Sequence, residues 1–184
     1  MRCFVAVDVP EQVLRQLGRL QEQLRREVEG VRWVKPSRMH LTLVFLGETT
    51  DDFVRRAEPE LAAACASSGP FRAALQGLGA FPVSERARVV WVGMREGREE
   101  LLGLQASVAA ALARVGFQPE RRKFSPHLTL GRLRTPGAVS ALCEREFASD
   151  AFDVDQVVLY RSVLRPSGPE YTRLVEFPLG QAPA

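Results

Sequence analysis

The sequence predicts an α+β fold with mainly antiparallel sheets. Segments rich in β-branched and aromatic residues alternate with segments of helical periodicity, but several strand segments follow one another with no helix between them. A doubly wound parallel sheet would require a helix between successive strands. One tetrapeptide also occurs twice, nearly half the chain apart, which indicates two pseudo-symmetric lobes with outer helices around a central cleft.

The N-terminal half is predicted to contain strands at 2–9, 31–34 and 40–47 and helices at 11–29 and 51–66. Leucines recur at 14, 17, 20 and 24, so the first helix has one apolar stripe that faces a core. Pro10 suits the first turn of this helix, and Gly30 suits its end. The segment Ser-Ser-Gly-Pro at 67–70 interrupts the pattern and is the predicted junction between the lobes.

The C-terminal half is predicted to contain strands at 71–82, 87–94, 127–133, 152–164 and 171–179 and helices at 99–115 and 139–147. The helix at 99–115 has an apolar stripe, and Gly116 follows it. We therefore expect one bilobal domain that occupies residues 1–184.

Composition indicates an ordinary globular protein. The 184 residues are 46% hydrophobic and 26% charged, which allows a substantial core. The net charge of +3 favours a phosphate-bearing partner but is too small to demonstrate one. Three widely spaced cysteines form no CxxC pair and fit a reducing cytoplasm. No segment approaches the roughly 20 apolar residues of a membrane span, so we expect a cytoplasmic protein with no membrane partner.

The chain contains only two histidines, and each begins the tetrapeptide His-Leu-Thr-Leu, at 40–43 and at 127–130. In a strand, residues two apart point to the same face. His40 therefore shares a face with Thr42, and His127 shares a face with Thr129, while the leucines point the opposite way. If the lobes meet across a cleft, two imidazoles and two hydroxyls would converge on one small volume.

Other interpretations of the two histidines are open. A lone histidine on a strand is usually packed and hydrogen-bonded without a catalytic role. A metal site is disfavoured because no His-x-His, HExxH or Cys/His spacing is present, and we expect no metal and no cofactor. A serine hydrolase would need a G-x-S-x-G turn, which is missing. Coincidence is a weak explanation, because Leu-Thr-Leu follows a given histidine in roughly one case in a thousand.

A pair of histidines can serve as acid and base on opposite sides of one phosphorus atom. The ordinary pKa of imidazole, about 6.5, lets the side chain give or take a proton near neutrality. The hydroxyls of Thr42 and Thr129, with the guanidinium of Arg132, would donate hydrogen bonds to the non-bridging oxygens. Strict alternation places Arg132 on the face opposite His127, so this role requires a bend in the strand.

The paired tetrapeptides resemble the 2H phosphoesterase superfamily, and in particular its RNA 2′,3′-cyclic phosphodiesterase branch, the LigT-like or 2′-5′ RNA ligase family. The resemblance rests on four stretches: RCFVAVDVP, VRWVKPSRMHLTLVFLGE, FSPHLTLGRL and LYRSVLRPSGPEYTRLVEFPL. It implies two antiparallel lobes around a cleft, and metal-independent hydrolysis of a 2′,3′-cyclic phosphate at an RNA 3′ end to a 2′-phosphate. It also implies that His40 is the proton donor and His127 the acceptor, with Thr42 and Thr129 holding the phosphate.

The partners expected from this resemblance are RNA with 2′,3′-cyclic phosphate ends, such as tRNA fragments, and nucleotides, bound by a monomer. Reversible 2′-5′ ligation would be the same chemistry with an alcohol in place of water. Phe124 could line the cleft and stack on a base, with core packing as the alternative. Tyr160 and Ser162 could also line the cleft, and Trp91 is expected in the core.

Two functional alternatives remain at this point. The first is a binding module for RNA ends or nucleotides that uses the same cleft without turnover. The second is a phosphodiesterase acting on a small cyclic nucleotide, a 2′-5′ oligonucleotide or ADP-ribose cyclic phosphate. The two histidines favour catalysis, because binding alone would be served equally well by arginine or lysine.

Overall fold

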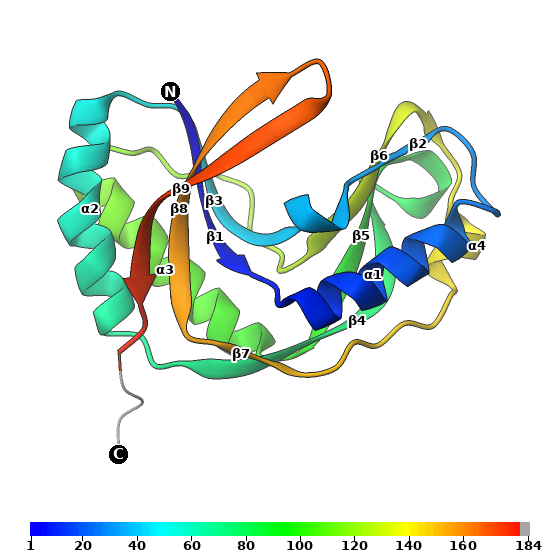
Figure 1. Ribbon diagram of the computed structural model, residues 1–184, viewed down its shortest axis with the longest axis horizontal. Coiled ribbons are helices and arrows are strands. Elements are labelled where there is room, and N and C mark those ends of the chain that lie inside the picture. The colour runs from blue at the N-terminus through cyan, green and yellow to red at the C-terminus, as the bar shows by residue number, and fades with distance from the viewer. Residues whose placement is uncertain (181–184) are drawn as a thin grey trace.

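The computed structural model describes residues 1–180, which form two antiparallel sheets with helices packed outside them (Figure 1). The first sheet has the order β3-β1-β8-β9, formed by His40–Glu48, Arg2–Asp8, Gln156–Arg165 and Gly168–Pro178. The second has the order β2-β6-β5-β4-β7, formed by Val31–Trp33, Leu128–Gly137, Ala87–Glu96, Phe71–Phe81 and Phe152–Val154. The predicted α+β class with antiparallel sheets is confirmed.

The two sheets repeat one topology. In the first, β1 is followed by helix α1 (Glu11–Leu24) and then by its antiparallel neighbour β3. In the second, β5 is followed by helix α3 (Arg98–Arg114) and then by its antiparallel neighbour β6. The order β3-β1-β8-β9 therefore corresponds, strand for strand, to β6-β5-β4-β7. The two tetrapeptides lie on the equivalent strands β3 and β6.

The helix that follows each central strand packs on the opposite lobe. Helix α3 lies beside α2 (Asp51–Ala66), and these helices contact β3 and β9 of the first sheet. Helix α1 lies beside the second sheet, near the short helix α4 (Ser140–Cys143), as Figure 1 shows. The chain therefore crosses from one lobe to the other at several points. Residues 67–70, the expected junction, connect α2 to β4 and form one of these passages.

One hydrophobic core extends through both lobes. Its buried members come from both sheets and from the inner faces of α1, α2 and α3. The leucines of both tetrapeptides belong to this core and are 3% exposed or less, as the alternation predicts: Leu41, Leu43, Leu128 and Leu130. The opposite faces of β3 and β6 are thereby left to the polar residues of the tetrapeptides.

The strand expected at 152–164 is two strands. β7 pairs with β4 in the second sheet, whereas β8 pairs with β1 and β9 in the first. Asp155 separates them, and its carbonyl oxygen accepts a hydrogen bond from the backbone N–H of Leu179 at 2.8 Å. The composition of this segment is suited to a strand throughout, so only the long-range pairing reveals the passage between sheets.

Two expected helices are shorter than their sequence patterns suggested. Helix α1 ends at Leu24 rather than at residue 29, because the apolar stripe ends there and residues 25–27 are exposed. Helix α4 is a single turn rather than the span 139–147. Its continuation is replaced by pairing with β4, where Gly77 donates its N–H to the carbonyl oxygen of Phe147 at 3.0 Å.

Gln21 connects α1 to the second sheet, and its replacement by Met is expected to destabilise the fold. The side chain is 2% exposed, and its Nε2 donates to the carbonyl oxygens of Val34 at 2.7 Å and Leu130 at 2.9 Å. Gln21→Met keeps the volume but removes both donors, so the free energy of unfolding should fall by about 1–3 kcal/mol. Urea denaturation measures this loss. Gln23→Met, at an exposed position on the same helix, is the control and should change stability little.

Candidate active site

His40 begins β3 and lies opposite Asp8 of the neighbouring strand β1. Its Nδ1 is 3.0 Å from the carbonyl oxygen of Arg38, which can only accept, so Nδ1 carries the proton and donates it. Three aromatic rings surround the imidazole: Phe4, Tyr160 and Tyr171, at centroid distances of 5.8, 4.8 and 5.4 Å. The ring is thereby fixed, with Nε2 as the nitrogen available for proton transfer.

His127 immediately precedes β6 and is held in the same way. Its Nδ1 donates to the carbonyl oxygen of Ser125 at 2.7 Å, again two residues earlier in the chain. The ring of Phe81 meets the imidazole edge-on at 5.0 Å, and the indole of Trp91 lies at 6.3 Å. Trp91 was expected in the core, but it pairs with Thr129 and lies on the histidine-bearing face. Both histidines therefore have equivalent local geometry.

A bulge in each strand changes which residues share the histidine's face. In β3, Thr42 pairs with Ala6 and Val44 with Val5, so Leu43 is an additional residue. In β6, Thr129 pairs with Trp91 and Gly131 with Val90, so Leu130 is the additional residue. One extra residue reverses the alternation beyond it.

The bulges return Arg132 to the face of His127 and Thr129, and Phe45 to the face of His40 and Thr42. Both residues are exposed, and the ring of Phe45 lies 6.1 Å from that of Phe4. The bend that the sequence required for Arg132 is this bulge.

The two imidazoles have different electrostatic surroundings. Burial lowers the pKa of His40, and the Asp8 carboxylate, whose Oδ1 lies 3.8 Å from Nε2, opposes this effect by raising it. Burial also lowers the pKa of His127, and the guanidinium groups of Arg132 and Arg122 lower it further. The Asp8 carboxylate therefore partly offsets the lowering of the pKa at His40, where Arg173 acts in the opposite sense, whereas the two arginines add to the lowering at His127.

Strands β3 and β6, which carry the two tetrapeptides, approach within 8 Å, Cα to Cα. The charge of Arg132 acts on groups that belong to both lobes. It adds to the lowering of the pKa of His127 that burial causes, and it opposes the rise that burial causes in the pKa of Tyr171, whose ring contacts His40. Arg132 thus acts on His127 itself and on a neighbour of His40.

Several residues near the histidines were not identified from the sequence. Asp8, Tyr171 and Arg173 surround His40 from β1 and β9, and Tyr160, suggested only as a lining residue, contacts the imidazole directly. A carboxylate at the end of an apolar strand was the one available signal for Asp8. Phe124 packs against the main core, the alternative that the sequence left open.

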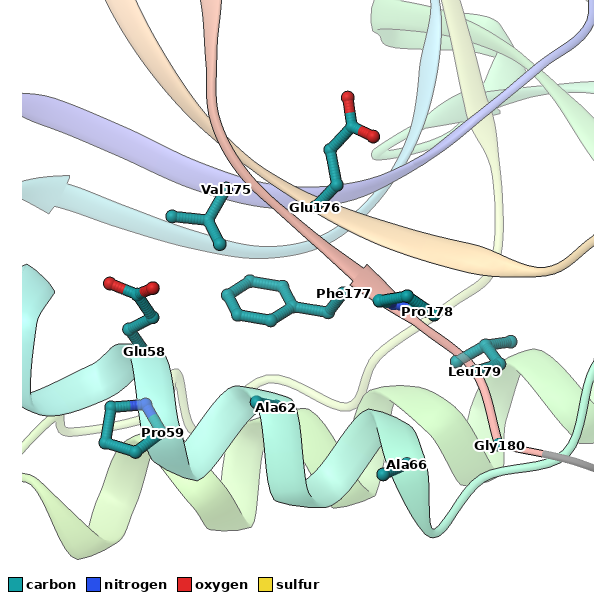
Figure 2. Close-up of a pocket in the computed structure, with 10 residues that line it drawn as sticks. All are labelled: Glu58, Pro59, Ala62, Ala66, Val175, Glu176, Phe177, Pro178, Leu179 and Gly180. Carbon is teal, nitrogen blue, oxygen red and sulfur yellow. The ribbon is translucent and has the colours of Figure 1, made fainter.

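A further cavity lies away from both histidines. It has a volume of about 590 Å³ and lies between α2 and β9, where Phe177 points toward Ala62 (Figure 2). Its lining includes no histidine and no basic residue. Within residues 1–180, no three His, Cys, Asp or Glu side chains gather closely enough to hold a metal ion. No helix of this part of the chain has both the length and the apolar character needed to cross a membrane.

Two matching antiparallel lobes, each contributing one anchored imidazole with a threonine on the same face, define a bilobal two-histidine protein. Residues 7–91 and 92–171 each match the family model of LigT-like phosphoesterases, and the chain belongs to this family. Each match contains one tetrapeptide, so the internal repeat seen in the topology is also present in the sequence.

Relatives of similar length align with nearly the whole chain. A protein of Archaeoglobus fulgidus named RNA 2′,3′-cyclic phosphodiesterase is 36% identical and covers 96% of this chain and 99% of its own. A protein of the same name from Thermotoga maritima is 34% identical, with 96% and 94% covered. Among solved structures, TT0787 of Thermus thermophilus has a TM-score of 0.84 at 30% identity, with 98% and 99% covered. E. coli LigT complexed with 3′-AMP has a TM-score of 0.81 at 28% identity, with 98% of each chain covered.

Arg132→Ala is expected to raise the pKa of His127, because a positive charge that disfavours the imidazolium is removed. The two histidines should give two resolved Cε1–H signals in NMR, so the titration of each can be followed separately. Arg134→Ala removes the same charge two residues further along β6, and Arg134 is not among the groups that shift His127. An equal response to both substitutions would contradict the position assigned to Arg132.

Proposed function

We propose that the protein hydrolyses 2′,3′-cyclic phosphates at RNA 3′ ends to 2′-phosphomonoesters. The observation that carries the proposal is the pair of equivalent imidazoles, each with Nδ1–H donated to a backbone carbonyl and Nε2 left free. Membership of the LigT-like phosphoesterase family and the name shared by its curated relatives support the substrate class. Catalysis is favoured over simple binding because the site provides two groups that transfer protons near neutrality.

In the proposed reaction, neutral His127 acts as base and protonated His40 acts as acid. Nε2 of His127 removes a proton from water as the water oxygen attacks phosphorus, and the P–O3′ bond breaks. Nε2 of His40 gives its proton to the departing 3′ oxygen, so the phosphate remains on the 2′ oxygen. The Asp8 carboxylate beside His40 and the guanidinium groups beside His127 favour this assignment over the reverse.

Charge that develops on the non-bridging oxygens needs hydrogen-bond donors on the same face. Thr42 and Thr129 are two residues beyond the respective histidines and are half-buried. The guanidinium of Arg132 adds a positive charge beside His127. Preorganised donors of this kind are typically worth about 10²–10³-fold in rate each. We propose that no metal takes part, because the imidazoles and these donors supply all the required roles.

The same groups would catalyse ligation if a 5′-hydroxyl replaced water as nucleophile. We regard this as a secondary activity, and tRNA fragments with cyclic ends as one possible class of substrate. The solved complexes of E. coli LigT with 3′-AMP, ATP and NADP⁺ make a small nucleotide the second candidate substrate. A comparison of kcat/KM for a nucleoside 2′,3′-cyclic phosphate and for an RNA with the same terminal nucleotide separates the two.

Replacement of either histidine by alanine should remove most of the activity while the fold survives. Each imidazole fills one acid–base role, so kcat should fall roughly 10²–10⁴-fold in His40→Ala and in His127→Ala. Hydrolysis of an RNA with a 2′,3′-cyclic end measures the loss, and circular dichroism checks folding. Near-normal turnover by a folded His127→Ala protein would remove the base from the scheme.

The product and the response to chelator test the remaining parts of the proposal. Hydrolysis should continue in excess EDTA and leave the phosphate on the 2′ oxygen, because the proposed scheme has His40 protonate O3′. A product that resists periodate and releases its phosphate to alkaline phosphatase carries a phosphomonoester on the terminal ribose. Chromatography against 2′- and 3′-phosphate standards then identifies the position of this phosphate. A 3′-phosphate would show that the P–O2′ bond breaks and would contradict the proposed product. Inactivation by EDTA would show that a metal is required.

A further inference from the structure

We propose that Asp8 is the positioning residue that keeps a proton on Nε2 of His40, so that His40 enters the reaction as the acid. The inference rests on the proposed function, since it assigns a cause to the direction of proton transfer. It concerns a residue that touches neither the phosphate nor the leaving group and acts through the imidazole.

The position of Asp8 is fixed by the sheet and by two side-chain hydrogen bonds. It is the direct cross-strand neighbour of His40 in the β1–β3 pair. Tyr160 donates its hydroxyl proton to Asp8 Oδ1 at 2.5 Å, and Arg173 donates from Nη1 to Oδ2. Burial and the Asp8 carboxylate raise the pKa of Tyr160, so the phenol stays protonated as a donor. Both partners are donors, so the two carboxylate oxygens of Asp8 act as acceptors.

The charges that face His40 leave a net negative environment. Asp8 comes from β1, while Arg173, Tyr171 and Tyr160 come from β9 and β8, and the last two are neutral. The charge of Arg173 is shared with a second carboxylate, because its Nε donates to Glu176 at 2.7 Å. The carboxylate that faces the imidazole directly is Asp8, whose Oδ1 lies 3.8 Å from Nε2. After His40 gives its proton to the leaving oxygen, this carboxylate attracts the next proton to Nε2.

The other lobe has no counterpart of Asp8. Continuing the β5–β6 register past the pair Val92–Leu128 brings Gly93 opposite His127. A Cβ at Gly93 would lie 3.3 Å from the indole of Trp91 and 3.1 Å from the carbonyl oxygen of Gln76, so the position has little room for a side chain. The repeated lobes thus differ at the position directly opposite the imidazole, where one lobe has a carboxylate and the other a glycine. This difference is what would make one histidine the acid and the other the base.

Asp8→Asn tests the inference because it removes the charge and keeps the shape, while the amide oxygen can still accept from one of the two donors, Tyr160 and Arg173. NMR titration should show that the pKa of His40 falls while that of His127 changes little. The two signals are assigned with the single-histidine variants. At pH 8, hydrolysis should fall by roughly tenfold, because less His40 carries its proton. At the acidic end of the pH profile, where His127 limits the rate, activity should be close to that of the unchanged protein.

Two further variants separate charge from structural support. Tyr160→Phe breaks a hydrogen bond to Asp8 but leaves the carboxylate, so the pKa of His40 should not fall. Asp153→Asn removes a carboxylate of β7 that pairs with Arg72, and neither histidine should respond.

The inference is wrong if Asp8→Asn leaves the His40 titration unchanged, or if Tyr160→Phe lowers the pKa of His40 as much as Asp8→Asn does. Either result would leave the proposed function standing, provided that His40→Ala is inactive. A folded and active His40→Ala protein would instead overturn the proposed function itself.

Discussion

The hydrogen bond from Nδ1 of each histidine to the carbonyl two residues earlier is the interaction on which the site depends. It occurs at His40 with Arg38 and at His127 with Ser125. A carbonyl can only accept, so the bond selects the tautomer as well as the ring orientation. Without this bond, either ring nitrogen could carry the proton, and Nε2 would not be fixed in position. The threonines and the neighbouring charges would then have no defined geometry relative to the nitrogen that transfers the proton.

The repeated architecture supplies two similar imidazoles, and substitutions at equivalent positions make them different. The bulges after Thr42 and Thr129 bring Phe45 to one face and Arg132 to the other. Asp8 stands beside His40, whereas two arginines affect His127. In the proposed reaction, a symmetric pair could act in either direction across the phosphorus atom. The asymmetric charges would give that reaction a preferred direction, while the duplicated backbone keeps both rings in comparable geometry.

The features that depend on local pattern could be predicted from the sequence, and those that depend on distant pairing could not. Alternation predicted the buried leucines of both tetrapeptides and the face that His40 and His127 occupy. A bulge leaves no pattern in one strand alone, so the face of Arg132 required knowledge of its partner β5. The neighbours of His40 on β8 and β9 lie more than 100 residues away in the chain. For the same reason, the division of 152–164 between two sheets was missed.

The exchange of α1 and α3 between the lobes limits how the molecule can move. A clamshell opening would separate Gln21 of α1 from Leu130 of β6 and pull α3 away from β3, disrupting one continuous core. Such a motion would expose buried apolar surface, at a free-energy cost of about 25 cal/mol for each Å² exposed. A substrate of the proposed reaction would therefore meet a site whose two halves are held together before it binds. Shape and charge already present in the resting protein would then carry the discrimination between ligands.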